Sequence, residues 1–469
     1  MKSYQYWQKE LETLPREQLL ALQEHRLRHM MKYVWDRSAF YRHKFMESGI
    51  HWQDIQGLED LSQLPLTTKS ELRQNQIRCV EQGKAPYADV LCVPEEDVSV
   101  IISTAGTTGV PILMPFTAED RYNTSLAFGN SALRGLYSVG GGKGDILIYL
   151  YNMGGAIVGG GAGFITVGGC PPNSPIPVIP GHIGKSKLIL ETMRTLGVTI
   201  LYATPSFVLY LAELATKSGL DPRKDFKVRK IRVGGEPGPI AVPEMRTKIE
   251  KAWGAECYDG WGQAETQTRA IECVEKCGGH AMEDMSVFEV IDPETKKPLP
   301  LGEMGVLVVT SLTGNGSPLI RFDVNDLVRF NYETCACGRT SARMTLIRGR
   351  TDDMLKVRSV RFYPEEVQKT VQAIPGGTGR YLVIVDKDPA GRDTFTVKVE
   401  HQSEVADLEA FRKRVEVEIR NGIGLSPVVE LVLEGGLGRS AIKTTTILDF
   451  RKPGAREAYE EKVKLSKAY

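Results

Sequence analysis

The stretch that most constrains the fold of this chain is Ser103–Gly109, with the sequence Ser-Thr-Ala-Gly-Thr-Thr-Gly. The apolar run Val98–Ile102 before it predicts a buried strand, and Ile112–Phe116 after it predicts a second strand. Thr117-Ala-Glu-Asp120 then has the pattern of a capping box that opens a helix. A loop with two glycines and four hydroxyl side chains can turn its backbone N–H groups toward an anion. The stretch therefore predicts a phosphate-binding loop, with a hydroxyl-rich hairpin turn as the alternative.

The balance of charge excludes several classes of protein. The 59 Lys and Arg residues nearly cancel the 58 Asp and Glu residues, which argues against a nucleic acid or a membrane surface as a partner. No signal peptide precedes the first helical pattern, and no stretch is long and apolar enough to span a membrane. Eight cysteines in 469 residues are too few for a disulfide framework. These features predict a cytoplasmic protein of two domains or more.

Strand-like and helical segments alternate along the first 350 residues. The candidate strands are Ile146–Leu150, Phe164–Val167, Val198–Ala203 and Lys230–Val233, and the candidate helices are Leu14–Met46, Thr117–Leu136 and Lys185–Leu196. This alternation predicts an α/β fold with a parallel or mixed sheet flanked by helices. After residues 351–353 the pattern becomes that of a smaller α+β unit, residues 354–469. Its expected elements are strands near Tyr381–Val385, Thr394–Glu400 and Val428–Leu433 and a helix near Val405–Arg420.

Four more segments add to the pattern of the glycine-rich loop: Gly234–Gly238, Tyr258–Glu265, Pro318–Asp326 and Gly438–Lys443. The first follows a predicted strand, at the carboxyl edge of a sheet where ligands collect in α/β folds. In this order the segments resemble motifs of the phenylacetate–CoA ligase branch of the adenylate-forming (acyl-CoA synthetase) superfamily. A member of the 2-hydroxyisobutyrate–CoA ligase type is one alternative within that branch. The chain departs from the family pattern in four places: Val110 replaces Lys, Trp261 replaces Tyr, and Pro and Gly are missing before Lys443.

The resemblance implies an ATP-dependent carboxylate–CoA ligase with a large N-terminal domain, residues 1–350, and a small mobile C-terminal domain. Such an enzyme forms an acyl-adenylate and pyrophosphate from ATP, and then an acyl-CoA thioester and AMP. Two alternatives remain: an adenylating enzyme that loads a carrier protein, and a nucleotide-binding regulator without turnover. The expected ligands are a small carboxylic acid, ATP, Mg²⁺ and coenzyme A. The chain is possible as a homodimer, and the sequence does not decide its oligomeric state.

The resemblance also assigns roles to single residues. Glu265 is expected to bind Mg²⁺, because hard divalent cations prefer carboxylate oxygen. Lys443 is the expected adenylation lysine, since a cation there offsets charge that develops in the transition state. Asp352 is the expected hinge, and Asp326, with Asp323 as its competitor, is expected to bind the ribose hydroxyls. The residues expected to contact the nucleotide are Ser103, Thr104, Gly106, Thr107, Thr108, Gly109, Gly235, Glu236, Pro237, Asp259, Trp261, Gly262, Asp326 and Arg350.

The acid pocket is expected to be lined by Tyr149, Tyr151, Asn152, Tyr202 and Ser206, on the same resemblance. So many polar side chains suit an acid that carries its own polar group, because a site built to bind a hydroxyl rejects analogues without it. A short 2-hydroxy or branched acid is one candidate. An aryl acetic acid, typical of the family, is the other, and the sequence leaves both open.

The cysteines fall into two tight groups, with Cys273 near His280 and Cys335 near Cys337. Three thiolates and one imidazole suit a tetrahedral structural zinc that has no open position for catalysis. The predicted zinc site therefore lies within residues 273–337, with Cys277 as a substitute for either member of the first group. The alternative is two unrelated pairs of reduced cysteines.

Overall fold

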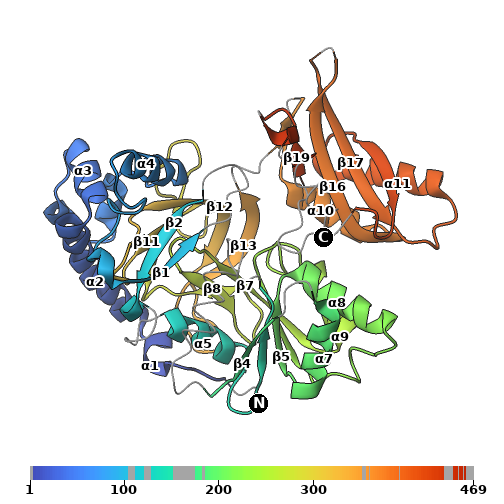
Figure 1. The fold of residues 1–469 in the computed structure, drawn as a ribbon, viewed down its shortest axis with the longest axis horizontal. Coiled ribbons are helices and arrows are strands. Elements are labelled where there is room, and N and C mark those ends of the chain that lie inside the picture. Colours follow the sequence, from blue (N-terminus) through green and yellow to red (C-terminus); the bar gives the residue numbers. More distant parts are fainter. Residues whose placement is uncertain are drawn as a thin grey trace. The chain divides into compact units, whose positions relative to one another are not determined.

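The computed structural model of the chain describes residues 4–103, 111–120, 128–151, 175–181, 185–350, 355–358, 360–389, 391–437, 447–452, 454–457 and 459–460. The chain divides into two compact units, Met1–Ile347 and Arg348–Tyr469 (Figure 1). The predicted boundary at residues 351–353 lies outside the described residues, so its place stays a prediction.

An 11-stranded mixed sheet forms the centre of the first unit. Its parallel part contains, in spatial order, β4 (Val178–Pro180), β3 (Leu147–Tyr149), β5 (Ile200–Ala203), β6 (Lys230–Val233) and β7 (Glu256–Gly262). The sheet continues with β8 (Arg269–Glu272), β9 (Gly279–Ala281), β13 (Arg343–Arg350), β12 (Phe322–Asn331), β11 (Gly305–Ser311) and β10 (Ser286–Ile291). Because β8 runs antiparallel to β7, the sheet changes from parallel to antiparallel pairing at this point. The predicted mixed sheet and three of its four candidate strands are confirmed, and Phe164–Val167 lies outside the described residues.

Three helices cover one face of the parallel strands, namely α7 (Ser186–Leu196), α8 (Pro205–Lys217) and α9 (Glu244–Trp253) (Figure 1). The core of this layer includes Ile148, Leu201 and Ile231 from the strands and Leu190, Val208 and Ile249 from the helices. Since side chains alternate along a strand, the positions between these residues point to the opposite face. There α5 (Phe128–Ser138) packs Leu133 and Leu136 against Leu147 and Ile200.

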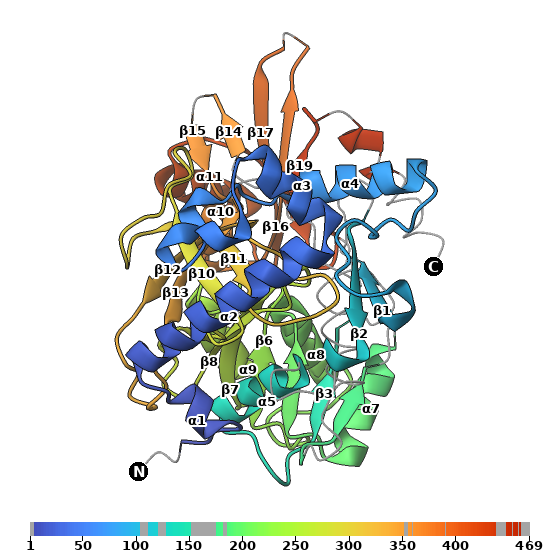
Figure 2. The same ribbon diagram turned by 90° about the vertical axis from the view of Figure 1, so that its left-hand side faces the viewer.

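The N-terminal helices pack on the antiparallel half of the sheet, and Figure 2 shows α2 lying across it. They are α1 (Lys9–Glu12), α2 (Arg16–Arg37), α3 (Ala39–Glu47) and α4 (Lys69–Glu81), with short 3₁₀ turns at Trp52–Asp54, Glu59–Gln63 and Glu95–Asp97. In their core, Leu27 and Met31 pack with Leu307 and Phe322. The single helix predicted over Leu14–Met46 is wrong in one respect. Ser38 breaks it, because its hydroxyl accepts a hydrogen bond from Tyr41 N and starts α3.

The glycine-rich loop joins two antiparallel strands, β1 (Val98–Ser103) and β2 (Leu113–Thr117). The prediction that the first strand is buried is wrong, because Ile101 is 48% exposed and only Ile102 is buried on it. A two-stranded sheet that packs through one face leaves its other face in solvent. After β2, Thr117 and Asp120 exchange the two hydrogen bonds of a capping box, as predicted.

The second unit contains a four-stranded sheet in the order β18-β17-β16-β19. Its elements are β14 (Leu355–Val357), β15 (Val360–Phe362), α10 (Pro364–Ala373), β16 (Gly377–Lys387), β17 (Asp393–His401), α11 (Leu408–Ile423), β18 (Val428–Leu433) and β19 (Ile447–Asp449). Val371 and Val415 of the two helices pack with Val383 and Val397 of the strands. The three strands and the helix expected from the sequence are present. None of the described helices of the chain is long and apolar enough to cross a membrane.

Candidate active site and metal centre

The turn Gly234–Gly238 follows β6 directly and lies at the carboxyl edge of the parallel strands, as predicted. Gly235 has a φ of +77°, a left-handed value that favours glycine. A Cβ atom on Gly234 would lie 2.5 Å from the carbonyl oxygen of Gly260, so the ends of β6 and β7 meet closely here. Tyr151 donates a hydrogen bond of 2.8 Å to the Gly234 carbonyl. The family resemblance implies that this turn holds adenine, and the turn is tied to a side chain expected to line the acid pocket.

Two acidic side chains brace this turn. Asp259 is buried, and its carboxylate accepts hydrogen bonds of 2.8 Å from both Ile240 N and Gly260 N. Burial raises the pKa of Asp259 to about 7. Glu236 accepts a 2.9 Å hydrogen bond from the Ser206 hydroxyl at the start of α8. Asp259 thus holds the backbone just after the turn, and Ser206 is joined to the turn itself, while the direct ligand contacts expected of both remain predictions.

Trp261 and Asp326 come together from β7 and β12, and the indole Nε1 donates a 2.6 Å hydrogen bond to Asp326 Oδ2. The Trp261 ring is buried and packs on Phe288 at a centroid distance of 6.4 Å. Asp326 is half-buried, whereas its competitor Asp323 is buried. This geometry supports Asp326 as the ribose ligand. It also gives Trp261 a role that the sequence analysis did not foresee, which is to fix the orientation of that carboxylate.

Glu265 lies four residues after Trp261 and is 5% exposed. Lys69 Nζ lies 2.8 Å from its Oε1 atom. Lys69 is the first residue of α4, and the segment before it pairs with β12 through Thr67, which donates to Arg321 O and accepts from Asp323 N. Lys69 is a site residue that the sequence analysis missed. Its only signal was a lysine just after a capping threonine, which does not reveal a partner nearly 200 positions away.

The tyrosines expected to line the acid pocket form a compact group. The ring centroids of Tyr149, Tyr151 and Tyr202 lie 5.0–5.2 Å apart. The Tyr149 hydroxyl is buried and has no hydrogen-bond partner among the described residues. Burial raises the pKa of both Tyr149 and Tyr151, so both hydroxyls stay protonated at neutral pH.

The remaining predicted site residues divide into two groups. Ser103 ends β1 opposite Leu113, Pro237 lies in the adenine turn, and Gly262 ends β7. Arg350 ends β13, and its side chain lies outside the described part of the structure. The other residues lie outside the described ranges altogether, and their roles stay predictions: Thr104, Gly106, Thr107, Thr108, Gly109, Asn152, Asp352 and Lys443.

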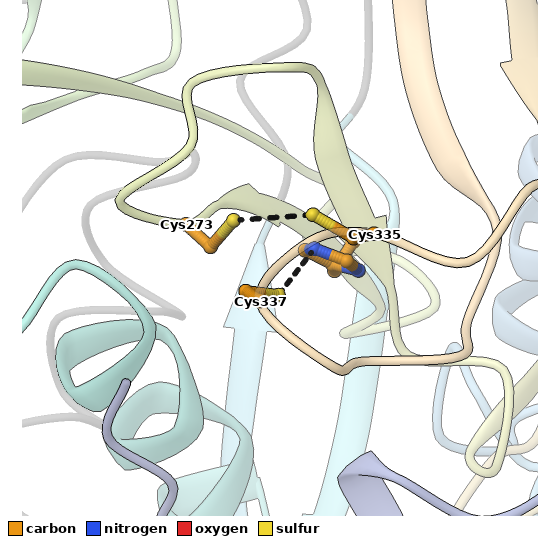
Figure 3. Close-up of side chains that lie close together, drawn as sticks. Cys273, Cys335 and Cys337 are labelled. Atoms are coloured by element: carbon orange, nitrogen blue, oxygen red, sulfur yellow. Dashed lines mark hydrogen bonds between the residues drawn. The ribbon is translucent and has the colours of Figure 1, made fainter. Parts of the chain in front are cut away.

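A second cluster joins the β8–β9 loop and β9 to the β12–β13 loop. Cys273, His280, Cys335 and Cys337 are all buried, and their ligand atoms lie within 4.8 Å of one another (Figure 3). Cys273 Sγ lies 3.8 Å from Cys335 Sγ, and Cys337 Sγ lies 3.5 Å from His280 Nε2. Tetrahedral zinc with bonds of about 2.3 Å to sulfur and about 2.05 Å to nitrogen requires edges of about 3.8 Å and about 3.6 Å. Two edges of the cluster therefore have the lengths that a zinc ion requires, and the structure brings the two groups of predicted ligands together.

Neighbouring polar groups support this arrangement. Ser341 Oγ lies 3.4 Å from His280 Nδ1, which orients the ring with Nε2 toward Cys337. Hydrogen bonds from Cys273 and Cys335, together with His280, lower the pKa of the Cys337 thiol. Cys277 falls outside the set of four, although its Sγ lies 3.5 Å from that of Cys335. Arg343 instead donates a 2.8 Å hydrogen bond to the Cys277 sulfur.

Comparison with known proteins shows the family to which the chain belongs. Residues 19–313 match a family described as AMP-binding enzyme, and residues 359–451 match the AMP-binding enzyme C-terminal domain. The chain belongs to the adenylate-forming, AMP-binding enzyme family. Among the relatives of this adenylate-forming enzyme is a phenylacetate–coenzyme A ligase of Thermus thermophilus, 33% identical over 95% of this chain and 100% of the relative. The ligase of the same name from Escherichia coli is 30% identical over 94% of this chain and 97% of its own.

Solved structures of a coenzyme A ligase also resemble this chain. A 2-hydroxyisobutyryl-CoA ligase in the postadenylation state, in complex with 2-HIB-AMP, is 26% identical to this adenylate-forming enzyme with a TM-score of 0.83. The match covers 98% of this chain and 95% of that chain. The same ligase in the thioesterification state, with 2-HIB-AMP and CoA, is 27% identical with a TM-score of 0.67 and the same coverage. The resemblance to the phenylacetate–CoA ligase branch is confirmed.

Proposed function

We propose that this adenylate-forming enzyme is an ATP-dependent carboxylate–CoA ligase. An acid carboxylate attacks the α-phosphate of ATP, pyrophosphate leaves, and the thiol of coenzyme A then displaces AMP from the acyl-adenylate. The observation that carries the proposal is the hydrogen bond from Tyr151 to the Gly234 carbonyl. It joins the acid-binding and adenine-binding elements into one site, which is what a carboxylate and an α-phosphate need in order to react.

In this proposal the residues of the site supply binding and orientation. The turn Gly234–Gly238 holds the base, and Asp326 accepts hydrogen bonds from the ribose, with its carboxylate fixed by Trp261. Glu265 would hold Mg²⁺, whose charge offsets that of the departing pyrophosphate. Lys443 would bridge the acid carboxylate and the α-phosphate. The phosphate loop, including Thr104, Thr107 and Thr108, would donate hydrogen bonds to the phosphate oxygens.

Coenzyme A is the acceptor in this proposal, in preference to a carrier protein. Relatives that match this chain over nearly their whole length are coenzyme A ligases. A regulator without turnover is disfavoured, because the turn, Asp326 and Glu265 are all held by supporting contacts.

The test is a panel of carboxylic acids in ATP–pyrophosphate exchange, with coenzyme A added in a second step. We expect exchange to depend on the acid, and thioester and AMP to appear in equal amounts once coenzyme A is present. Exchange without thioester would identify a carrier-protein loader. ATP binding with no exchange for any acid would identify a regulator and overturn the proposal.

The two half-reactions take place at one site but need different groups beside it. We propose that a rotation of the C-terminal domain about Asp352 exchanges these groups. Residues 351–353 form the hinge, and residues 354–469 move as the C-terminal domain. The related 2-hydroxyisobutyryl-CoA ligase has been solved in both a postadenylation and a thioesterification state, which supports the proposal.

We further propose one structural zinc ion per chain, held by Cys273, His280, Cys335 and Cys337. The Cys337 loop also anchors the N-terminus, because Tyr6 donates to the Cys337 carbonyl and Arg339 lies 2.7 Å from Glu12. The ion would therefore cross-link the two loops and stabilise the contact of α1 with them.

The matched pair Cys337→Ser and Cys277→Ser tests this zinc site. Cys337→Ser removes a ligand, so we expect metal content to fall well below one zinc per chain and the Tm to fall by on the order of 5–10 °C. Cys277→Ser removes a neighbouring sulfur outside the set of four and should keep the zinc. Elemental analysis and thermal unfolding measure both effects. Wild-type protein without stoichiometric metal after purification free of chelators would refute the site, as would equal metal loss in both variants.

A further inference from the structure

A row of four side chains crosses the face of the sheet that carries the acid pocket. Tyr149 pairs in register with Tyr202, Tyr202 with Arg232, and Arg232 with Tyr258, across β3, β5, β6 and β7. Directly opposed residues on neighbouring strands point to the same face. Arg232 is therefore the one charged member of a row that starts with two tyrosines of the acid pocket.

Arg232 is buried, with an exposed fraction of 2%. Its guanidinium carbon lies 4.3 Å from the centre of the Tyr202 ring. A Cβ atom on Gly135 of α5 would lie 3.1 Å from its Nη1 atom, so the head of the side chain is enclosed between Tyr202 and α5. Among the described residues, no carboxylate pairs with Arg232, and its Nε atom has no hydrogen-bond partner.

A second cation on the same strand, Lys230, has a carboxylate partner. Lys230 lies two residues before Arg232 on the same face, and its Nζ lies 3.3 Å from the carboxylate of Glu256, its register partner on β7. At the next step of the row Tyr258 takes the place of an acid, so Arg232 has an aromatic neighbour on both sides. A buried charge without a partner is costly unless a ligand supplies the counter-charge.

The position of Arg232 fixes which part of a substrate it would meet. Gly234, at the nucleotide edge, is two residues further along β6, which corresponds to about 7 Å of strand. An acid whose reacting carboxylate faces the nucleotide would extend back along β6, so that its far end would approach Arg232. The unpartnered hydroxyl of Tyr149 lies on the same face and offers a further donor.

We infer that the acid substrate is a short dicarboxylic acid, of about four to six carbons, whose second carboxylate binds Arg232. This inference rests on the proposed ligase function and names its substrate class. Only the carboxylate at the nucleotide edge is adenylated and then transferred to coenzyme A, so the product is a thioester that keeps a free carboxylate. Arg232 is a specificity-determining residue, since guanidinium and carboxylate can form two parallel hydrogen bonds.

The test measures kcat/KM for thioester formation with matched acids, namely succinate and glutarate against butyrate and valerate. For the wild-type enzyme we expect the dicarboxylic acids to be preferred by about a hundredfold or more. Arg232→Met, which keeps the length of the side chain without its charge, should remove this preference by weakening the dicarboxylic acids and improving the alkyl acids. Arg232→Lys should restore part of the preference.

Lys230→Met is the matched control, because it removes a charge from the same strand and face. It should lower the Tm and leave the ratio between the two classes of acid unchanged. Wild-type turnover of alkyl or aryl acids with rejection of the dicarboxylic acids would overturn the inference and leave the ligase function standing. An unchanged acid preference in a folded Arg232→Met would also overturn it. Absence of thioester with every acid would instead contradict the ligase function itself.

Discussion

Replacing Glu265 with glutamine should lower the rate of acyl-adenylate formation by on the order of a hundredfold and raise the Mg²⁺ concentration required. The side chain is buried, and its Oε1 atom lies 2.8 Å from a lysine, so it is ordered and close to other site elements. An amide keeps the size and one acceptor oxygen but loses the charge that a divalent cation needs. Pyrophosphate exchange measured over a range of Mg²⁺ concentrations detects both changes. Thioester formation from supplied acyl-adenylate and coenzyme A should survive, because no pyrophosphate leaves in that step.

Lys69→Met provides the matched variant for this experiment. Lys69 and Mg²⁺ would compete for the same carboxylate, so removing the lysine should lower the Mg²⁺ concentration at half-maximal exchange. The two variants are therefore expected to shift the Mg²⁺ dependence in opposite directions. If both variants only lowered the Tm and left the Mg²⁺ dependence unchanged, Glu265 would be the partner of a structural ion pair and no metal ligand.

Replacing Lys443 with alanine should separate the two half-reactions. Acyl-adenylate formation should fall by on the order of a hundredfold or more, because the cation that offsets charge between the carboxylate and the α-phosphate is lost. Thioester formation from supplied acyl-adenylate should persist, since the proposed swing about Asp352 removes Lys443 from the site before this step. Single-turnover measurements of each half-reaction give the two rates separately.

Lys398→Ala is the control for Lys443→Ala. Lys398 belongs to the same unit and lies 2.8 Å from Glu430 in a surface ion pair on the sheet, so its loss should leave both half-reactions near wild type. Equal loss of both half-reactions in Lys443→Ala would contradict the division of labour and indicate damage to the whole unit.

The sequence predicted the parallel strands well because each is a short run rich in β-forming residues that alternates with helical segments. Lys230–Val233 is a strand with the predicted bounds, and the mixed sheet follows from the alternation with helices. The gathering of Cys273, His280, Cys335 and Cys337 was also predictable, since cysteines with this spacing in a chain with few of them are typical of a shared site. The exposure of Val98–Ile102 was not predictable. Periodicity alone does not tell whether a pair of strands is covered on one face or on both.

The contacts that the sequence analysis missed join residues that lie far apart in the chain. Lys69 meets Glu265 only because Thr67 pairs beside β12, and Trp261 meets Asp326 only because β7 and β12 lie in one sheet. Arg232 looked like one of two charged residues that alternate with apolar ones in the predicted strand. The role inferred for Arg232 depends on cross-strand register. The register places a tyrosine on each side of Arg232, where an acidic residue would have paired with its charge.

The central claim is that the chain activates a carboxylate as its acyl-adenylate. The most direct measurement uses a carboxylic acid labelled with ¹⁸O in both carboxylate oxygens, together with ATP and coenzyme A. One carboxylate oxygen forms the bond to the α-phosphorus, and the thiol later breaks the bond between that oxygen and the acyl carbon. Mass spectrometry should therefore find AMP that carries one ¹⁸O atom for each thioester formed. Unlabelled AMP, or label in inorganic phosphate together with ADP, would contradict the claim.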